Sequence, residues 1–502
     1  MNNSFTAIDL FAGIGGFRLA IEKNGGKCIN FSEIAPDAIK TYCENFPDAE
    51  GTNLGDITKI KMLPRHDLLT GGVPCQSWSI AGRNLGFDDD RGQLWNDSIY
   101  LLNQSKPKTF IFENVKGLSD PRNKQALDYI MLRIKEAGYH ANVHVLNSFD
   151  YGVPQSRVRI YIIGFKEKRF LDAFRLPEKT EPEDRITLAD ILDGYVKTTD
   201  GYKDERDLFG QPIHSTKSSP TSLSRNNNGF NDYFLFNDLR NGSTTIHSWE
   251  LEETTEKEKH ICLLLLRNRR KSIYGCLDGN PLSIAHFKAL DSKITEEDIR
   301  KLVDKKILKE EEYAYKVIGN RSTNLDEAEA LVLGESKNNI LIFDELTRER
   351  KFKIKKIKIS DVLKSLERKG LIKCIETRFD FRNTKISTGL FGINRVFLPS
   401  SNIFPTLVAS DSNDFVTTIG LSALNEKQYK KEFIEKVFNK KAYRKITVTE
   451  ACKIQGFPAN FKLPPTRARW MKLIGNSVSV PVIEKLVGAI CNTGVFTCLA
   501  HD

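Results

Sequence analysis

Cys75 stands in a setting that suits a nucleophile. It lies in the stretch TGGVPCQSWSIAG (residues 70–82), directly after Pro74 and close to Gly71 and Gly72, which allow a substrate to approach the backbone. The preceding residues HDLLTGG read as a strand, and the loop after such a strand is where ligands bind in open α/β sheets. A thiolate there can attack an electrophilic carbon. The alternative is a small packing cysteine, which needs no such loop.

Glu113, Arg157 and Arg159 can assist at the same edge. Glu113 lies near the end of the apolar run FIFENV (110–115), where a carboxyl group can share a proton with a basic ring nitrogen. Arg157 and Arg159 lie in PQSRVRIY (154–161). Alternate residues of a strand share a face, so the two arginines can orient an anion or a carbonyl together. An exposed ladder of ion pairs is the alternative for them.

A glycine loop indicates a second ligand. Gly13, Gly15 and Gly16 lie in DLFAGIGGF (9–17), after an expected strand and before an expected helix, where backbone N–H groups can approach a ligand. The third glycine of the GxGxxG pattern is absent, so a dinucleotide pyrophosphate fits poorly. An ordinary strand-to-helix turn explains the glycines equally well.

Two carboxylates favour a nucleoside at this loop. Glu33 ends the second expected strand, and Asp56 stands in GDIT near the end of a third segment. Acidic groups at successive strand ends can hold a ribose and an adenine amine without any phosphate, as in S-adenosylmethionine. Loop-capping surface carboxylates are the alternative for each one singly.

These side chains need a sheet whose strand ends meet at one edge. Short apolar segments alternate with helical or loop segments up to about residue 192, which predicts a parallel α/β sheet with crossover helices. The expected strands are TAIDLFAG, KCINFSEI, HDLLTGG, KTFIFENV and VRIYIIGF, and the first expected helix is GFRLAIEKNG. Near the end, Thr447 and Glu450 have capping-box spacing before a helix that stops at Gly456. After it, GNSVSVPVIEKLVGAI predicts a turn and a helix that packs back on the sheet.

The chain of 502 residues predicts more than one domain, because single cores stop growing at about 250–300 residues. From about 193 to 440 the composition shifts to Asn, Ser, Lys and Glu. Within it, residues 298–309 and 361–373 resemble each other as an amphipathic helix followed by a short apolar strand, as in a winged helix-turn-helix unit. Coincidence between two such helices is the alternative, and a wing can also serve protein contacts.

Composition predicts a cytoplasmic protein. No apolar run approaches the ~20 residues of a membrane span, and the first residues lack the pattern of an export signal. The nine cysteines form no CxxC pair, so neither a disulfide scaffold nor a metal site is expected. Lys and Arg outnumber Asp and Glu by 75 to 65, and the densest basic stretch is RERKFKIKKIKI at 348–359. Such runs are weak evidence for a polyanion partner.

Seven motifs together resemble the DNA cytosine-5 methyltransferases of restriction–modification systems. They are FAGIGGF, GDIT, GVPCQSWSIAG, FENVKGL, YGVPQSRVRIYIIGF, EACKIQGFP and GNSVSVPV, in the order of that family. They cover roughly residues 5–165 and 444–485. The resemblance implies an S-adenosylmethionine-dependent Rossmann-like domain at 1–192, a target-recognition domain at 193–470 whose end holds the late motif 444–461, and a return to the first domain at 471–502.

The resemblance also implies roles for single residues. Cys75 would be the nucleophile, with Glu113, Arg157 and Arg159 around a cytosine that is flipped out of the duplex. The cofactor site would be lined by Phe11, Gly13, Gly15, Gly16, Glu33, Ile34, Asp56, Ile57, Pro74, Leu94, Asn476 and Val478. Ile34 replaces an aromatic residue common in the family, and Ala81 replaces a serine. Gly82 and Gly86 would be hinges of a loop that closes over the base.

The resemblance predicts a monomer that methylates C5 of cytosine in a short duplex DNA sequence, together with a restriction endonuclease acting on the same site. A tRNA cytosine-5 methyltransferase is the main alternative, because PCQ and ENV do not distinguish the nucleic acid. The long basic insertion favours DNA. An inactive DNA-binding regulator of the same fold is a further alternative, against which the complete set of catalytic residues argues.

Overall fold

A computed structural model describes most of the chain. The described residues are 4–74, 90–181, 184–195, 232–234, 246–276, 279–319, 324–348, 358–382, 395–401, 403–421 and 426–497. The predicted nucleophile Cys75, Ala81 and the predicted hinges Gly82 and Gly86 lie outside them.

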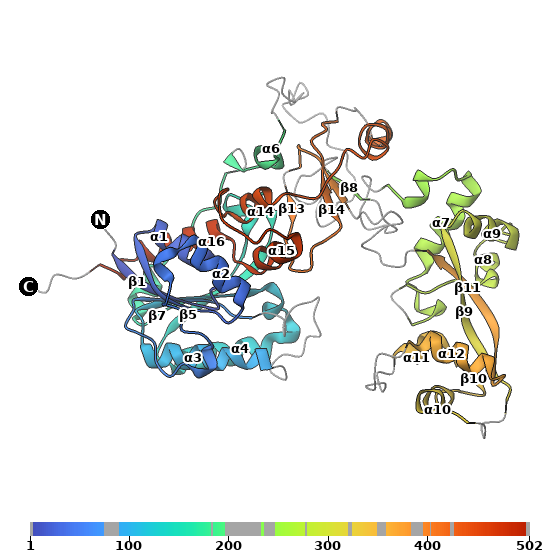
Figure 1. Cartoon of the computed structure of the whole chain (residues 1–502), viewed down its shortest axis with the longest axis horizontal. Coiled ribbons are helices and arrows are strands. Elements are labelled where there is room, and N and C mark those ends of the chain that lie inside the picture. The colour runs from blue at the N-terminus through green and yellow to red at the C-terminus, as the bar shows by residue number, and fades with distance from the viewer. Residues whose placement is uncertain are drawn as a thin grey trace, which may run out of the picture.

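A six-stranded sheet organises the N-terminal part (Figure 1). Its strands, in spatial order, are β2 (Gly26–Ser32), β1 (Phe5–Leu10), β3 (Leu68–Gly72), β4 (Thr109–Val115), β7 (Val158–Phe165) and β5 (His140–Asn147). The five strands expected from the sequence are all present. The edge strand β5 was not among them.

The prediction of a parallel sheet is right for β1 to β4 and wrong for β7. β7 runs antiparallel to both of its neighbours, β4 and β5. The segment from β5 to β7 holds only a short 3₁₀ turn (Ser148–Tyr151) and the two-residue strand β6 (Gln155–Ser156). A parallel connection requires a crossover of a dozen or more residues, so this short link reverses the strand.

Helices cover both faces of the sheet. One face packs on α3 (Asp90–Ser105) and α4 (Lys124–Glu136), which supply buried Trp95, Ile99, Ile130 and Ile134. The opposite face packs on α1 (Gly16–Lys23), α2 (Pro36–Asn45) and the C-terminal helices. Short helices α5 (Lys168–Ala173) and α6 (Leu188–Ile191) follow β7.

The C-terminal segment returns to the first sheet, as predicted. α14 (Val448–Gln455) has the capping box of Thr447 and Glu450 and ends at Gly456, whose φ of 84° suits glycine. The predicted turn at Gly475 and Asn476 is wrong, because both residues close α15 (Arg467–Asn476). The break comes at Ser477–Ser479, before α16 (Val480–Cys491).

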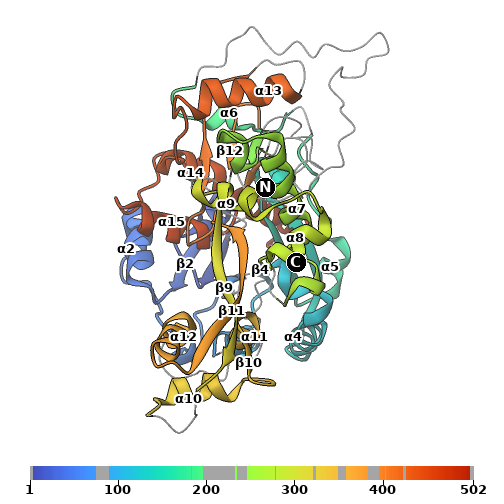
Figure 2. The same cartoon turned by 90° about the vertical axis from the view of Figure 1, so that its right-hand side faces the viewer.

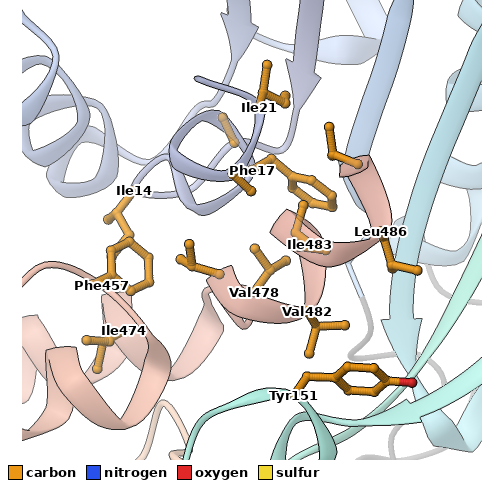
Figure 3. Close-up of a cluster of buried hydrophobic side chains, with 14 of the residues drawn as sticks. Ile14, Phe17, Ile21, Tyr151, Phe457, Ile474, Val478, Val482, Ile483 and Leu486 are labelled. Atoms are coloured by element: carbon orange, nitrogen blue, oxygen red, sulfur yellow. The ribbon is translucent and has the colours of Figure 1, made fainter. Parts of the chain in front are cut away.

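Apolar side chains of α16 explain this return. Figure 3 shows Ile483 of α16 beside Phe17 of α1, and Val482 beside Tyr151. Among the described helices, Arg467–Cys491 is the one span long and apolar enough to cross a membrane, and 61% of its apolar window is buried. The apolar residues of this span are therefore explained by packing in the protein core.

The region predicted to recognise the target, called the recognition region below, contains two separate groups of elements among the described residues. Near the first sheet lie β8 (Asp232–Phe234), β12 (Arg395–Phe397), β13 (Phe404–Pro405), β14 (Asp414–Val416) and α13 (Glu426–Glu432), which a π-helical turn (Phe433–Phe438) extends. β14, β12 and β8 form one small sheet, and β13 pairs with β6. Cores of the two regions meet here, because Phe397, Phe404 and Val416 belong to the same buried cluster as α1 and α16.

The second group forms a unit of its own, drawn apart from the first sheet in Figure 1 and seen in front of that sheet in Figure 2. It comprises α7 (Glu256–Asn268), α8 (Ile284–Leu290), α9 (Glu296–Asp304), β9 (Leu308–Val317), α10 (Glu327–Gly334), β10 (Ile340–Ile342), α11 (Phe343–Arg348), α12 (Ile359–Arg368) and β11 (Ile372–Phe381). The helix and strand expected at 298–309 and again at 361–373 are confirmed. The domain boundaries and the winged-helix assignment stay predictions.

Candidate active site

A cavity of about 380 Å³ opens at the carboxyl ends of β1 to β4. Its wall brings together segments that are far apart in the sequence, from the loop after β1 to the break between α15 and α16. The predicted residues that line it are Phe11, Gly13, Gly16, Glu33, Ile34, Asp56, Ile57, Pro74, Leu94, Glu113, Arg157, Arg159, Asn476 and Val478. This volume falls in the range of small-molecule sites.

Gly15 is the one predicted cofactor residue, among those described, that does not line the cavity. Its φ is 90°, and a Cβ there would lie 2.4 Å from the ring of Phe46. Gly15 thus allows the loop to pack against α2. Gly13 has a φ of 55° and no atom within 4 Å of a built Cβ, so it leaves open space for a ligand. Phe11 holds a positive φ of 53° at the cavity, a conformation that costs strain in a bulky residue.

Glu33 organises the loop that it was predicted to serve. Its Oε2 accepts a hydrogen bond from the Gly13 N–H at 2.9 Å, and its Oε1 accepts from the N–H groups of Ile34 and Ala35, both at 2.8 Å. A carboxylate has about four lone-pair positions, so acceptor capacity remains for a ligand hydroxyl. Ile34 is 68% exposed and offers an apolar face at the cavity mouth.

Asp56 caps the 3₁₀ helix Ile57–Lys59. Its Oδ1 accepts from the Thr58 N–H at 3.0 Å and from the Thr58 hydroxyl at 2.8 Å, and these bonds lower the pKa of the carboxyl group. Among the described residues, the cation that pairs with Oδ2 is Lys59, at 3.7 Å. Asp56 is therefore an ionised acceptor at neutral pH, with one oxygen available to a ligand.

Asp9 is buried beneath the glycine loop, at the end of β1. The pKa of Asp9 is raised to about 7, mainly by burial and also by the nearby Glu33 charge. The hydrogen bond that Oδ1 accepts from the Thr70 hydroxyl at 2.9 Å acts in the opposite direction and lowers the pKa. Its Oδ2 has no hydrogen-bond partner among the described residues. A carboxyl group in this position is most stable when protonated.

We expect Asp9 to make the stability of the fold depend on pH. An unfolded Asp ionises near pH 3.8 and the folded one near 7, so the folded chain binds one extra proton in between. The protonated Asp9 stabilises the fold fully below about pH 4, and this contribution is lost as pH rises to about 7. The loss is on the order of 4 kcal/mol.

The Asp9→Asn variant should lack this pH dependence. Urea unfolding at pH 5 and pH 8 measures it: the wild-type protein should lose more stability between the two pH values than the variant does. Thr70 can still donate to the Asn oxygen, so the variant keeps that bond. Equal pH dependence in both proteins would contradict the assignment.

Glu113 and Arg159 form an ion pair in the cavity wall. Arg159 Nε lies 3.1 Å from Glu113 Oε1, and the two side chains are only 15% and 10% exposed. The pair places a carboxyl group and a guanidinium side by side on the adjacent strands β4 and β7. Next to Glu113, the buried Asn114 donates from Nδ2 to the carbonyl of Val73 at 3.2 Å. This bond fixes the backbone that leads through Pro74 to Cys75.

Arg157 has a different environment from Arg159. Its buried guanidinium donates to the carbonyl oxygens of Leu407, Gly475 and Ser477, the last at 2.6 Å. Arg157 thereby ties the start of β7 to the break between α15 and α16, which carries Asn476 and Val478. The expectation that both arginines orient the base directly therefore fits Arg159 better than Arg157.

Two buried glutamine side chains extend this connection, and neither was predicted from the sequence as a site residue. Gln155 donates from Nε2 to the Gln455 side chain at 2.8 Å, and Gln455 donates to the carbonyl of Ser477 at 2.8 Å. Both glutamines are fully buried. They stand inside quoted motifs, but their pairing joins residues 300 positions apart, for which the sequence carries no signal.

The cavity thus combines an open glycine loop, two carboxylates at successive strand ends and a carboxyl–guanidinium pair. Such a set can hold a nucleoside at one end and a polar ring at the other. On a mixed α/β sheet with one reversed strand, it defines a methyltransferase of the Rossmann-like class.

Comparison with known proteins agrees with this class. A family model described as C-5 cytosine-specific DNA methylase matches residues 5–262 and 261–492. The type II methyltransferase M.HgiBI of Herpetosiphon aurantiacus is 41% identical over 488 residues, which cover 97% of this chain and 96% of that relative. M.HgiCII of the same organism, also a type II methyltransferase, is 40% identical over 498 residues, 98% of each chain. The chain belongs to the C-5 cytosine-specific DNA methylase family and is a DNA (cytosine-5-)-methyltransferase of the type II restriction–modification kind.

Proposed function

We propose that this enzyme transfers a methyl group from S-adenosylmethionine to C5 of a cytosine that is flipped out of a short, specific duplex DNA sequence, through a covalent bond between Cys75 and C6. The observation that carries the proposal is the cavity wall itself. It joins the predicted cofactor residues to the Glu113–Arg159 pair and ends at Pro74, directly before Cys75.

The residues at one end of the cavity fit the nucleoside part of S-adenosylmethionine. Gly13 leaves open space above the loop, while Glu33 and Asp56 offer carboxylate oxygens to ribose hydroxyls or the adenine amine. Ile34 and Ile57 offer apolar contact to the adenine ring. The cofactor, when bound, supplies an electrophilic methyl group on a sulfonium centre.

The chain's own residues must make the cytosine reactive. C5 of cytosine is too weak a nucleophile by itself, so the Cys75 thiolate adds to C6 and gives the ring enamine character at C5. Glu113 donates a proton toward N3 and stabilises the adduct, and Arg159 holds the Glu113 carboxyl group in place. After methylation, a base such as water takes the C5 proton, the electrons of that C–H bond restore the C5–C6 double bond, and the C6–S bond breaks to give back the thiolate, while the N3 proton returns to Glu113.

The target base must leave the duplex, because its C6 is inaccessible in a stacked helix. Extrusion costs a few kcal/mol, which binding contacts have to offset. Arg157 acts in this scheme as a positioning residue, since its guanidinium is occupied by the carbonyl groups around Asn476. We further propose action in the cytoplasm, as a monomer, alongside an endonuclease specific for the same site.

Labelled methyl transfer tests the proposal. Purified enzyme with methyl-labelled S-adenosylmethionine should label duplex DNA and leave tRNA unlabelled. Bisulfite sequencing of DNA from cells that express the chain should then show one short sequence in which a single cytosine is protected. Labelling confined to tRNA, or protection scattered without a common sequence, would refute the proposed substrate.

A further inference from the structure

The separate unit of the recognition region contains the same turn twice. After α9, the N–H groups of Lys305, Lys306 and Ile307 donate to the carbonyls of Lys301, Val303 and Leu302. After α12, those of Lys369, Gly370 and Leu371 donate to Ser365, Glu367 and Leu366. Each residue of the second set lies 64 positions after its counterpart, and Lys306 and Gly370 share a positive φ of 60° and 67°.

Each turn carries the same ion pair, between a partly exposed lysine and a buried glutamate. Lys305 contacts Glu258 at 2.8 Å, and Lys369 contacts Glu329 at 2.5 Å. Each glutamate is the third residue of a capping box, on α7 and on α10, and is 5% and 1% exposed. Each lysine also donates to the carbonyl two residues before the helix N-cap. Chance similarity between two amphipathic helices does not explain a shared ion pair with a shared second acceptor.

The strands show the same relation. β9 and β11 pair antiparallel, with Leu308 opposite Phe381 and Val317 opposite Ile372. At the offset of 64, Leu308 corresponds to Ile372 and Val317 corresponds to Phe381, so the two ends of the ladder are equivalent. A bridge from Leu282, before α8, reaches Phe379 of β11. Leu341, before α11, pairs with Tyr315 of β9, the counterpart of Phe379. Each half therefore covers its helices with a strand of the other half, around a pseudo-two-fold axis through the ribbon.

We infer that residues 256–317 and 327–381 are two copies of one helix–helix–helix–strand unit, and we propose that only the second copy binds the phosphate backbone of duplex DNA, through α12. The proposal deepens the proposed function and rests on it. Its basis is a charge difference between equivalent helices.

The third helix of the first copy neutralises its own cations. On α9, Arg300 pairs with Glu296 at 2.6 Å and Lys301 pairs with Glu297 at 2.9 Å. Arg300 also lies 3.5 Å from Glu310 on β9. These paired charges leave little excess positive potential on the exposed face of α9.

The third helix of the second copy holds its exposed cations in no close ion pair, although Asp361 and Glu367 lie on the same helix. Lys364, the counterpart of Arg300, and Arg368, one turn later, are exposed and lie beyond ion-pair distance of every carboxylate in the described residues. Lys358 and Lys373, on either side of the helix, are also exposed and also lie beyond ion-pair distance of every carboxylate in the described residues. Lys364 and Arg368 are four residues apart and so share one helix face.

The sequence before each helix increases the difference. The basic stretch RERKFKIKKIKI at 348–359 leads directly into α12, whereas DSKIT at 291–295 leads into α9. Cations without a close ion pair on one helix face, next to a basic run in the sequence, suit the phosphates of duplex DNA, where the attraction comes from counterion release. A neutralised helix of the same shape gains no such attraction.

Matched double variants on the two equivalent helices test the proposal. Lys364→Gln with Arg368→Gln should weaken binding to duplex DNA roughly ten-fold at physiological salt and lower the slope of log K against log salt by about 2. Arg300→Gln with Lys301→Gln, in the first copy, should leave both quantities unchanged. All four side chains are exposed, and circular dichroism and Tm check that both variants stay folded.

The outcomes separate this proposal from the proposed function. If the wild-type enzyme labels DNA but the α12 variant binds with unchanged affinity and slope, or if both variants weaken equally, the assignment to α12 is overturned. If the wild-type enzyme fails to label DNA and labels tRNA, the proposed substrate falls. Repeating the titration with tRNA then shows whether the difference between the copies concerns another nucleic acid, which also overturns the proposal of a DNA contact.

Discussion

Cys75→Ala is expected to abolish methyl transfer, by a factor on the order of 10⁴ or more, while binding to duplex DNA stays largely intact. The physical reason is that, in the proposed mechanism, addition of the Cys75 thiolate to C6 is what makes C5 nucleophilic. The backbone before Cys75 is anchored by Asn114, so removal of a single sulfur should not disturb the cavity wall. Transfer of labelled methyl groups and gel-shift titration measure the two quantities.

Cys43→Ala provides the matched control. Cys43 lies half-buried on α2, and burial raises the pKa of its thiol, so it offers little thiolate at neutral pH. Its replacement should leave methyl transfer near the wild-type rate.

A second readout is the covalent complex with DNA that carries 5-fluorocytosine, whose C5 lacks a removable proton. The wild-type and Cys43→Ala proteins should be trapped on it, and trapping of Cys75→Ala would show that another residue forms the bond.

The sequence predicted most of the cavity because its residues follow strands. Glu33, Pro74 and Glu113 each stand at the end of a short apolar run, and parallel strands bring their carboxyl ends to one edge. Local pattern therefore sufficed to place them together. The reversal of β7 did not follow from local pattern, since it depends on the short connection after the unexpected edge strand β5.

Long-range packing explains what the sequence did not predict. The roles of Gly15 and Arg157 depend on partners elsewhere in the chain: Gly15 meets Phe46, and Arg157 reaches acceptors 250 and 320 residues away. The duplication shows the same limit. The resemblance of residues 298–309 and 361–373 suggested it, but Glu258 and Glu329, whose ion pairs support the duplication, lie outside those segments and 71 positions apart.

Glu113→Gln should lower the rate of methyl transfer by about 10²–10⁴-fold and leave duplex DNA binding nearly unchanged. An amide of the same shape can donate an N–H to N3 and accept from the exocyclic amine, so it can still hold the base. It can also accept from Arg159 in place of the carboxylate, which keeps the 3.1 Å contact available. What the amide lacks is a proton to give.

Glu113→Asp separates that loss from a loss of shape. The aspartate keeps a transferable proton but withdraws it by one methylene, so transfer should fall less than in Glu113→Gln while contact with Arg159 weakens. Single-turnover rates with saturating DNA and S-adenosylmethionine compare the chemical step alone. A near-normal rate for Glu113→Gln would show that the proton comes from another group, and a slower rate for Glu113→Asp than for Glu113→Gln would show that position, rather than the proton, is what Glu113 contributes at β4.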